Sequence, residues 1–257
     1  MIATIGGFDG MHIAHQELIK RAQKLIIIEK GSNLTPDNDR CDYTNLPCVF
    51  YKLEEIKHLL PLQFIELLKN QDIKKIVIGE DFRFGKDKQG GIALLKKHFE
   101  VEVIKEIKLE NIPVHSRVIR EFIKNKKIKK ANKFLGHLYK IKGKKIKGQG
   151  LGSKKLVPTI NIKPIKNYLI PPNGVYITLT NKLPSLTFIG IRSTDNNFSI
   201  ETYILNDNFI KDNLIIIEFL DFLRENKAIS NLEELKRLIN NDIKKATKQL
   251  EKLLHRL

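Results

Sequence analysis

The chain has little cysteine, no tryptophan and no long apolar run, and each absence excludes a class of protein. Its two cysteines, Cys41 and Cys48, form no CxxC pair and have no histidine cluster beside them, which argues against a zinc site or a redox pair. No uninterrupted apolar run reaches about 18 residues, and the start lacks a basic segment followed by a long apolar one. We therefore expect a cytoplasmic protein with reduced thiols that is neither exported nor embedded in a membrane.

Acidic residues are scarce relative to basic ones. Asp and Glu number 29 against 46 Lys and Arg, so the formal net charge is +17 and the pI is near 9.7. This balance favours polyanionic partners such as nucleotides or nucleic acid, although lysines scattered among isoleucine and asparagine are also typical of a solvated basic surface. Aromatic residues make up only 7%, and no stacking array or known nucleic-acid module is evident. We expect no nucleic-acid partner.

The first half alternates apolar segments with amphipathic ones. We predict an opening strand, a helix over 15–28, a polar loop over 29–48, a short strand at 49–51, a helix over 62–69, a strand at 75–78, a helix over 92–98, a strand over 101–107 and a basic helical run over 116–133. Such alternation predicts a parallel, doubly wound, Rossmann-like α/β sheet. The polar loop is long enough to be mobile or to fold over a ligand, and we interpret the lysines of the basic run as a solvated face.

The pattern changes near residue 134. Short strands are predicted at 139–146, 175–179, 186–191, 199–205 and 214–222, separated by Gly, Asn, Asp and Pro turns. They indicate an antiparallel barrel or sandwich. A last helix is expected to begin at Ser230, which has capping-box spacing to Glu233, and to pack its apolar stripe on the barrel. We therefore predict two domains, residues 1–132 and 133–257.

Two turns that contain glycine follow predicted strands, at 6–10 and 79–85, where a parallel sheet binds its ligands. Glycine lets the main chain approach a ligand closely, and a helix after the first turn would direct free N–H groups at a phosphate. His12 and His15 lie three residues apart, so on a helix both could donate to the same phosphate oxygens. Two alternatives are a plain turn with solvated histidines and a zinc site, for which no third ligand is evident. Arg120 follows a serine at a helix start and is a further candidate for a phosphate contact.

Two ordered sets of motifs resemble the bacterial bifunctional riboflavin kinase/FAD synthetases over nearly the whole chain. In the first half the matching segments are 6–15, 79–85 and 116–120, and this half is similar to nucleotidylyltransferases with a His-x-Gly-His motif. In the second half they are 148–152, 158–161, 172–176, 201–203 and 222–225, similar to a riboflavin kinase module, which in that family is a six-stranded antiparallel barrel. The resemblance implies phosphorylation of riboflavin to FMN and adenylylation of FMN to FAD with release of pyrophosphate, both with ATP and Mg²⁺.

The resemblance also implies a role for each matching residue. The expected contacts to ATP or its phosphates are Gly6, Phe8, Asp9, Gly10, Ser116 and Arg120 in the first half and Gly148, Gly150 and Gly152 in the second. His12 and His15 are expected to neutralise charge in adenylyl transfer. Flavin or nucleotide contacts are expected from Asp81, Phe82, Arg83 and Arg224.

Three residues of the second half suit phosphoryl transfer. Thr159 and Asn161 offer oxygen ligands for Mg²⁺, which usually takes only one or two from protein, and Glu201 is the candidate general base. The alternatives are an exposed strand position for Glu201 and a surface ion pair with Glu225 or Asp221 for Arg224.

The sequence departs from the family pattern at several positions. Ala14 replaces the motif glycine, His115 and Arg117 stand where the family has Ser and Thr, and no Phe-x-Pro-x-Pro stretch follows the first helix. In the second half, Ser153 replaces an arginine, and residues 156–157 are Leu-Val in place of Gly-Phe. Two other functions therefore stay open: a monofunctional riboflavin kinase with a degenerate first half, and a basic nucleic-acid-binding protein. The oligomeric state does not follow from the sequence.

Overall fold

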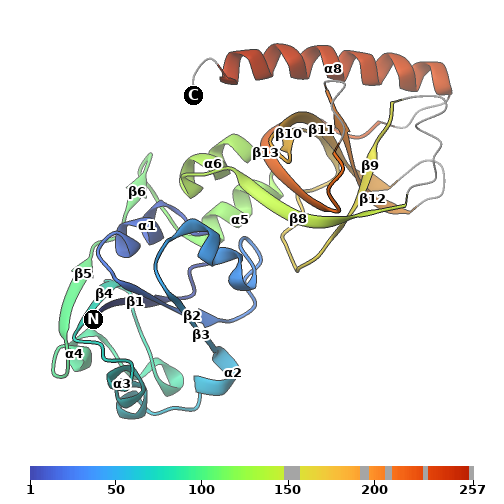
Figure 1. The fold of residues 1–257 in the computed structure, drawn as a ribbon. Helices are drawn as coiled ribbons and strands as arrows, with labels where there is room; N and C mark the ends of the chain where they lie inside the picture. The colour runs from blue at the N-terminus through green and yellow to red at the C-terminus, as the bar shows by residue number, and fades with distance from the viewer. Residues whose placement is uncertain (148–156, 192–196, 206–209, 228–230, 255–257) are drawn as a thin grey trace. The chain divides into compact units, whose positions relative to one another are not determined.

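The chain forms two compact units in a computed structural model that describes residues 1–147, 157–191, 197–205, 210–227 and 231–254 (Figure 1). The first unit comprises Met1–Ile119 and Phe134–Gly136, and the second comprises Arg120–Lys133 and His137–Leu257. No helix among these residues is long and apolar enough to cross a membrane.

The first unit is built on five parallel strands in the order β3-β2-β1-β4-β5. They are β1 (Ile2–Gly6), β2 (Lys24–Glu29), β3 (Cys48–Lys52), β4 (Lys75–Gly79) and β5 (Glu100–Ile104). The central strands are apolar on both faces, as expected of a parallel sheet covered by helices. The predicted α/β class is therefore confirmed.

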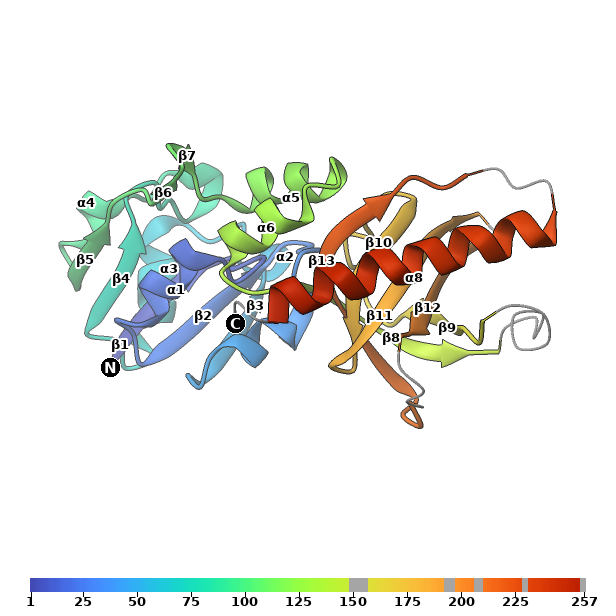
Figure 2. The same cartoon turned by 90° about the horizontal axis from the view of Figure 1, so that it is seen from above.

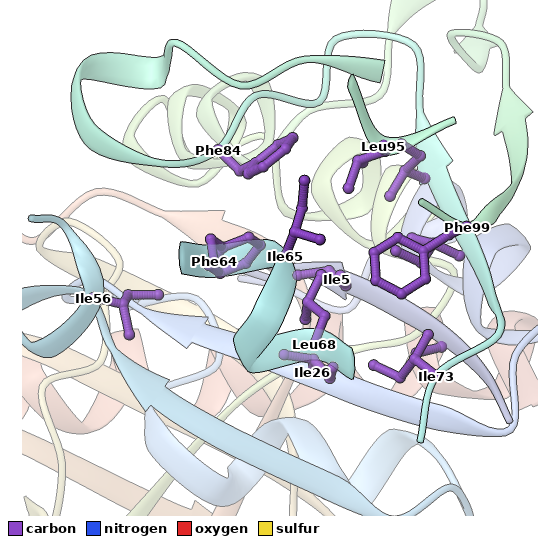
Figure 3. Packing of buried hydrophobic residues seen from close by; sticks show 13 residues of the cluster. Ile5, Ile26, Ile56, Phe64, Ile65, Leu68, Ile73, Phe84, Leu95 and Phe99 are labelled. Atoms are coloured by element: carbon purple, nitrogen blue, oxygen red, sulfur yellow. The ribbon is translucent and has the colours of Figure 1, made fainter. Parts of the chain in front are cut away.

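Short helices connect these strands. They are α1 (Ile13–Ile19), α2 (Leu53–Ile56), α3 (Pro61–Lys69) and α4 (Ile92–Leu95), with 3₁₀ turns at Asp37–Tyr43 and Lys86–Lys88. A small hairpin, β6 (Lys108–Leu109) and β7 (Ile112–Pro113), follows β5. Figure 3 shows the main core, in which Phe64, Ile65 and Leu68 of α3 pack near Ile5 and Ile26 of the sheet.

The helix predicted over 15–28 is wrong in its second half. Helix α1 ends at Ile19, and the Gln23 amide donates to the Ile2 carbonyl oxygen as β2 begins. Leu25, Ile26 and Ile27 are fully buried in the sheet. A short apolar run that continues a helical spacing also fits a central strand, and periodicity alone does not separate the two.

The basic run over 116–133 forms two helices, α5 (Ser116–Lys124) and α6 (Ile128–Leu135), separated at Lys126, whose φ is 60°. Lys124, Lys127 and Lys129 are exposed, as expected of a solvated face, whereas Lys126 and Lys130 are half-buried. Lys126 and Lys129 form ion pairs with Glu225 and Asp221. These contacts attach the helical segment to strand β13 (Leu214–Arg224) and to the residue that follows it, within the second unit.

The second unit is a closed antiparallel barrel in the order β10-β11-β12-β9-β8-β13. Its strands are β8 (Tyr139–Ile146), β9 (Ile160–Pro164), β10 (Gly174–Thr180), β11 (Leu183–Ile191), β12 (Phe198–Ile204) and β13 (Leu214–Arg224). The structure thus decides between barrel and sandwich. The sequence prediction missed β9, whose five residues include two polar side chains and a proline.

Helix α8 (Leu232–Leu254) runs along one side of the barrel in both views (Figures 1 and 2). Ala246 and Leu250 are buried against Val175, Ile177 and Leu186, which confirms the predicted packing. The observed cap is Asn231, whose side-chain oxygen accepts from the Glu234 amide at 2.9 Å. The predicted cap, Ser230, lies outside the described residues.

Candidate active sites

The turn between β1 and α1 has a backbone that requires glycine at one position. Gly10 has a φ of 86°, and a Cβ there would lie 2.9 Å from Leu34 Cδ1. Phe8 and Met11 also adopt left-handed φ values, 51° and 43°, and their side chains are buried. Such values are uncommon outside glycine and persist only where the surrounding packing imposes them. The turn is therefore held rigidly by the core beneath it.

Asp9 and Ser116 hold this turn in place. Asp9 is buried, and its Oδ1 accepts from the backbone amides of Leu34 and Thr35 at 2.9 and 3.0 Å. The Ser116 hydroxyl donates to the Asp9 carbonyl oxygen at 2.7 Å. These contacts connect the first turn to the segment after β2 and to the start of α5.

His12 and His15 stack on one another at the end of the turn. Their ring centroids are 3.5 Å apart with an interplanar angle of 17°, and the Phe8 ring meets His15 edge-on at 5.1 Å. His12 Nδ1 accepts from the His15 amide at 3.4 Å and so caps α1. Burial, followed by the charges of His12, His115, Lys30 and Arg40, lowers the pKa of His15 well below its usual value. The His15 ring is therefore neutral near pH 7.

A cavity of about 900 Å³ opens in the first unit beside the two histidines. Residues from both glycine turns line it, so the topology brings the turns after β1 and β4 together, as the sheet rule predicts. The lining includes eight of the residues singled out from the sequence: Gly6, Phe8, His12, His15, Asp81, Phe82, Arg83 and Ser116. Asp9 and Gly10 support the turn from beneath, and Arg120 is half-buried in the second unit.

Three positions where the sequence departs from the family pattern also lie at this cavity. Ala14, His115 and Arg117 are all lining residues. His115 Nε2 lies 3.1 Å from Glu106 Oε1, and its charge contributes to the lowered pKa of His15. His115 and Arg117 thus place two basic side chains at the cavity.

Arg40 is a structural residue that the sequence analysis missed. Its side chain is fully buried, and Nη1 donates to the Gly7 carbonyl oxygen at 2.7 Å and to Ser32 Oγ at 3.1 Å. Nε donates to the Asp37 carbonyl oxygen at 2.9 Å, and the guanidinium pairs with Glu29. Asp39 and Arg40 of the polar 29–48 segment are buried, and Arg40 connects this segment to the first glycine turn. An arginine within a polar loop carries no sequence signal of burial.

The two cysteines, Cys41 and Cys48, lie next to one another in the first unit. Both are free thiols, and burial and a hydrogen bond with Cys41 raise the pKa of Cys48 to about 12. Within the described residues no group of three or more His, Cys, Asp or Glu side chains is placed to hold a metal ion. A protonated, partly buried thiol is a poor nucleophile and a poor ligand.

A second constellation lies on the barrel of the second unit. Glu201 of β12 is directly opposite Asn161 of β9, and the Thr159 hydroxyl donates to Glu201 Oε2 at 3.2 Å. Residues 159 and 161 alternate with 160, so their side chains point to the same side as Glu201. The neighbouring Thr202 is fully buried among other hydroxyls inside the barrel, so Glu201 faces outward. Strand pairing thus unites residues 42 positions apart.

Arg224 at the end of β13 is engaged by helix α8. Its Nε and Nη2 donate to the Asp242 carboxylate at 2.8 and 2.6 Å, and Asp242 is buried. This bidentate pair differs from the surface pairs with Glu225 or Asp221 considered from the sequence. The three predicted phosphate-binding glycines, Gly148, Gly150 and Gly152, lie outside the described residues.

Replacing Arg40 is expected to destabilise the first unit. The variant Arg40→Met removes the cationic partner of the Glu29 carboxylate and the donor to the Gly7 carbonyl oxygen, and breaking such a buried pair costs about 3 kcal/mol. Urea denaturation measures the loss. The control Arg21→Met removes exposed pairs with Glu17 and Glu102 and should cost less than about 1 kcal/mol. Equal losses in the two variants would contradict the role assigned to Arg40.

The lowered pKa of His15 predicts a loss of stability in mild acid. Below about pH 6.5 the His15 imidazole binds a proton in the unfolded protein but stays neutral in the folded protein. The free energy of unfolding therefore falls as the pH falls. The contribution reaches at most about 1.4 kcal/mol per pH unit. His15→Gln should therefore lose less stability between pH 7 and pH 5 than the wild-type chain. His98→Gln, at an exposed position, controls for the removal of one imidazole; a His15→Gln curve parallel to wild type would refute the prediction.

Comparisons with known proteins agree on one family. Residues 43–118 match a family model described as FAD synthetase, and residues 135–250 match one described as riboflavin kinase. Two curated relatives named bifunctional riboflavin kinase/FMN adenylyltransferase come from Buchnera aphidicola. The protein of the Schizaphis graminum subspecies is 30% identical over 93% of this chain and 91% of its own, and that of the Acyrthosiphon pisum subspecies is 29% identical over 94% and 91%.

The fold itself has a close counterpart among solved structures. A crystal structure described as a macrolide-efflux protein from Streptococcus pneumoniae superposes with a TM-score of 0.82, at 21% identity, over 94% of this chain and 91% of its own. This likeness concerns the fold alone. From the sequence relatives and the two family models, the chain belongs to the family of bifunctional riboflavin kinases/FMN adenylyltransferases.

Proposed function

We propose that the chain carries out both activities named for its family and divides them between its two units. The second unit phosphorylates riboflavin to FMN with ATP, and the first adenylylates FMN to FAD with release of pyrophosphate. The observation that carries the proposal is the presence of two separate polar constellations, each built by residues distant in sequence. One is the cavity beside His12 and His15, and the other is the cluster around Glu201. The cytoplasm, where thiols stay reduced, suits the two free cysteines.

Adenylyl transfer needs alignment and charge neutralisation more than it needs a protein nucleophile. The FMN phosphate attacks the α-phosphorus of ATP and pyrophosphate leaves, so the protein must place the two phosphates in line. The stacked imidazoles of His12 and His15 present N–H donors at the cavity. Because nearby negative charge raises the pKa of a histidine, bound phosphates would favour protonation of His15. Its positive charge would then be available as negative charge grows on the leaving group.

The other residues of the first unit shape and line the cavity. Gly6 and Phe8 form its wall at the first turn, and Asp81, Phe82 and Arg83 form it at the second. We assign the second turn to contacts with nucleotide or flavin. Asp9, Gly10 and Ser116 fix the path of the first turn. Arg120, which directly follows the first unit along α5, remains a proposed phosphate contact.

Phosphoryl transfer in the second unit is assigned to the Glu201 cluster. The Glu201 carboxylate is placed to accept or orient the proton of the riboflavin 5′-hydroxyl. The Thr159 hydroxyl and the Asn161 side-chain carbonyl lie on the same face, and oxygen donors in small number are what Mg²⁺ takes from protein. When bound, Mg²⁺ would neutralise phosphate charge. Gly148, Gly150 and Gly152 are proposed to contact the phosphates. Arg224, oriented by Asp242, is proposed to contact the flavin.

A product assay tests the proposal directly. Purified protein incubated with riboflavin, ATP and Mg²⁺ should yield FMN and then FAD, separated by chromatography. Glu201→Gln should lower the rate of FMN formation by about 100-fold or more, because a general base contributes at least that much. FAD formation from supplied FMN should be unchanged in this variant.

Glu251→Gln, at an exposed position of α8, is the matched control and should keep both rates. Absence of both FMN and FAD would overturn the proposal. FMN without FAD, even from supplied FMN, would favour a monofunctional kinase whose first unit has lost activity through Ala14, His115 and Arg117.

A further inference from the structure

Lys30 lines the first-unit cavity but belongs to none of the sequence motifs that point to this site. It follows β2, whose Ile27 is paired with Gly6 of β1, so the two strands end side by side. A Cβ built on Gly7 would lie 3.1 Å from Lys30 Cε, which places the lysine stem along the glycine turn. Lys30 lines the same cavity as His12 and His15.

The positive charge of Lys30 is not balanced by a neighbouring carboxylate. The adjacent Glu29 accepts from the amides of Gly31 and Ser32 and pairs with Arg40. Lys30 itself forms no ion pair within the part of the chain that the structure describes. Lys30 also contributes to the lowered pKa of His15, so its ammonium acts electrostatically on that ring.

Lys88, Lys105 and Arg117 also line the cavity, from the segments after β4 and β5 and from α5. Two further lining cations have contacts of their own. Lys57 pairs with Glu54, and the Arg83 guanidinium donates to the Phe82 carbonyl oxygen at 3.3 Å and lies beside Gly91. Neither contacts the first glycine turn in this way. Lys30 therefore combines three properties: placement on the turn, access to the cavity and a charge without a partner among the described residues.

We propose that Lys30 binds a phosphate group of the nucleotide substrate in the first-unit cavity, beside His12 and His15. An ammonium offers three donors and a compact charge, which suits a phosphate oxygen approached from the side of the turn. The absence of a carboxylate partner means that phosphate binding breaks no ion pair of Lys30. The inference rests on the proposed adenylyltransferase activity and adds a residue to that site.

The test is the Michaelis constant for ATP in FMN adenylylation by the full-length protein. Lys30→Ala is expected to raise it about tenfold, which corresponds to about 1.4 kcal/mol. Lys30→Arg keeps a cation and should stay within about threefold of wild type. The riboflavin kinase rate of each variant, measured on the same preparation, should be unchanged and reports that the protein is folded.

Lys57→Ala is the matched control, because it removes one lysine from the same cavity that is already paired with Glu54. An effect of Lys30→Ala no larger than that of Lys57→Ala would overturn the role of Lys30 while leaving the proposed function intact. An equal rise of the Michaelis constant for ATP in Lys30→Arg and Lys30→Ala would also overturn the role of Lys30, because the positive charge would then not account for the effect. Wild-type protein that makes no FAD from FMN would overturn the proposed function and the role of Lys30 together.

Discussion

The first-unit site depends on the ion pair between Arg40 and Glu29. The Arg40 side chain of this pair is fully buried, next to the first glycine turn. Burying a guanidinium is costly unless its donors are satisfied. Here they reach the Gly7 carbonyl, Ser32, the Asp37 carbonyl and Glu29. Because the Gly7 carbonyl belongs to the turn after β1, Arg40 joins this turn to the loop after β2. The cavity wall is thereby fixed before any substrate arrives.

The same arrangement sets the charges at the cavity. Glu29 is occupied by Arg40 and by two backbone amides, so it does not neutralise the neighbouring Lys30. Desolvation by burial, followed by the positive charges around the ring, lowers the pKa of His15 and keeps it neutral. A site held with excess positive potential and with donors already oriented is preorganised for phosphates, because little rearrangement is needed when their charge arrives. Part of the net charge of +17 is therefore concentrated at this cavity, which the total charge alone does not reveal.

In the second unit, antiparallel strand pairing positions the residues of the site. The register between β9 and β12 brings Glu201 opposite Asn161, and the two-residue period of the strand adds Thr159 to the same face. The interior of the barrel is filled by side chains that include a set of mutually bonded hydroxyls, which leaves the outer face for polar chemistry. Helix α8 supplies Asp242, which fixes the direction of Arg224 at the end of β13.

The sequence by itself indicated the parallel α/β sheet, an antiparallel barrel or sandwich, most of the strands and eight residues that line the first-unit cavity, because hydrophobic periodicity and short motifs are local properties. It failed at 20–28, where a buried strand continues a helical spacing, and at β9, whose residues are too polar to stand out. It also gave no indication of Arg40, Lys30 or Asp242. Their roles arise from partners distant in sequence, such as Gly7, which lies 33 positions from Arg40, and Arg224, which lies 18 positions from Asp242. Only tertiary packing decides which charges are buried, paired or left facing a cavity.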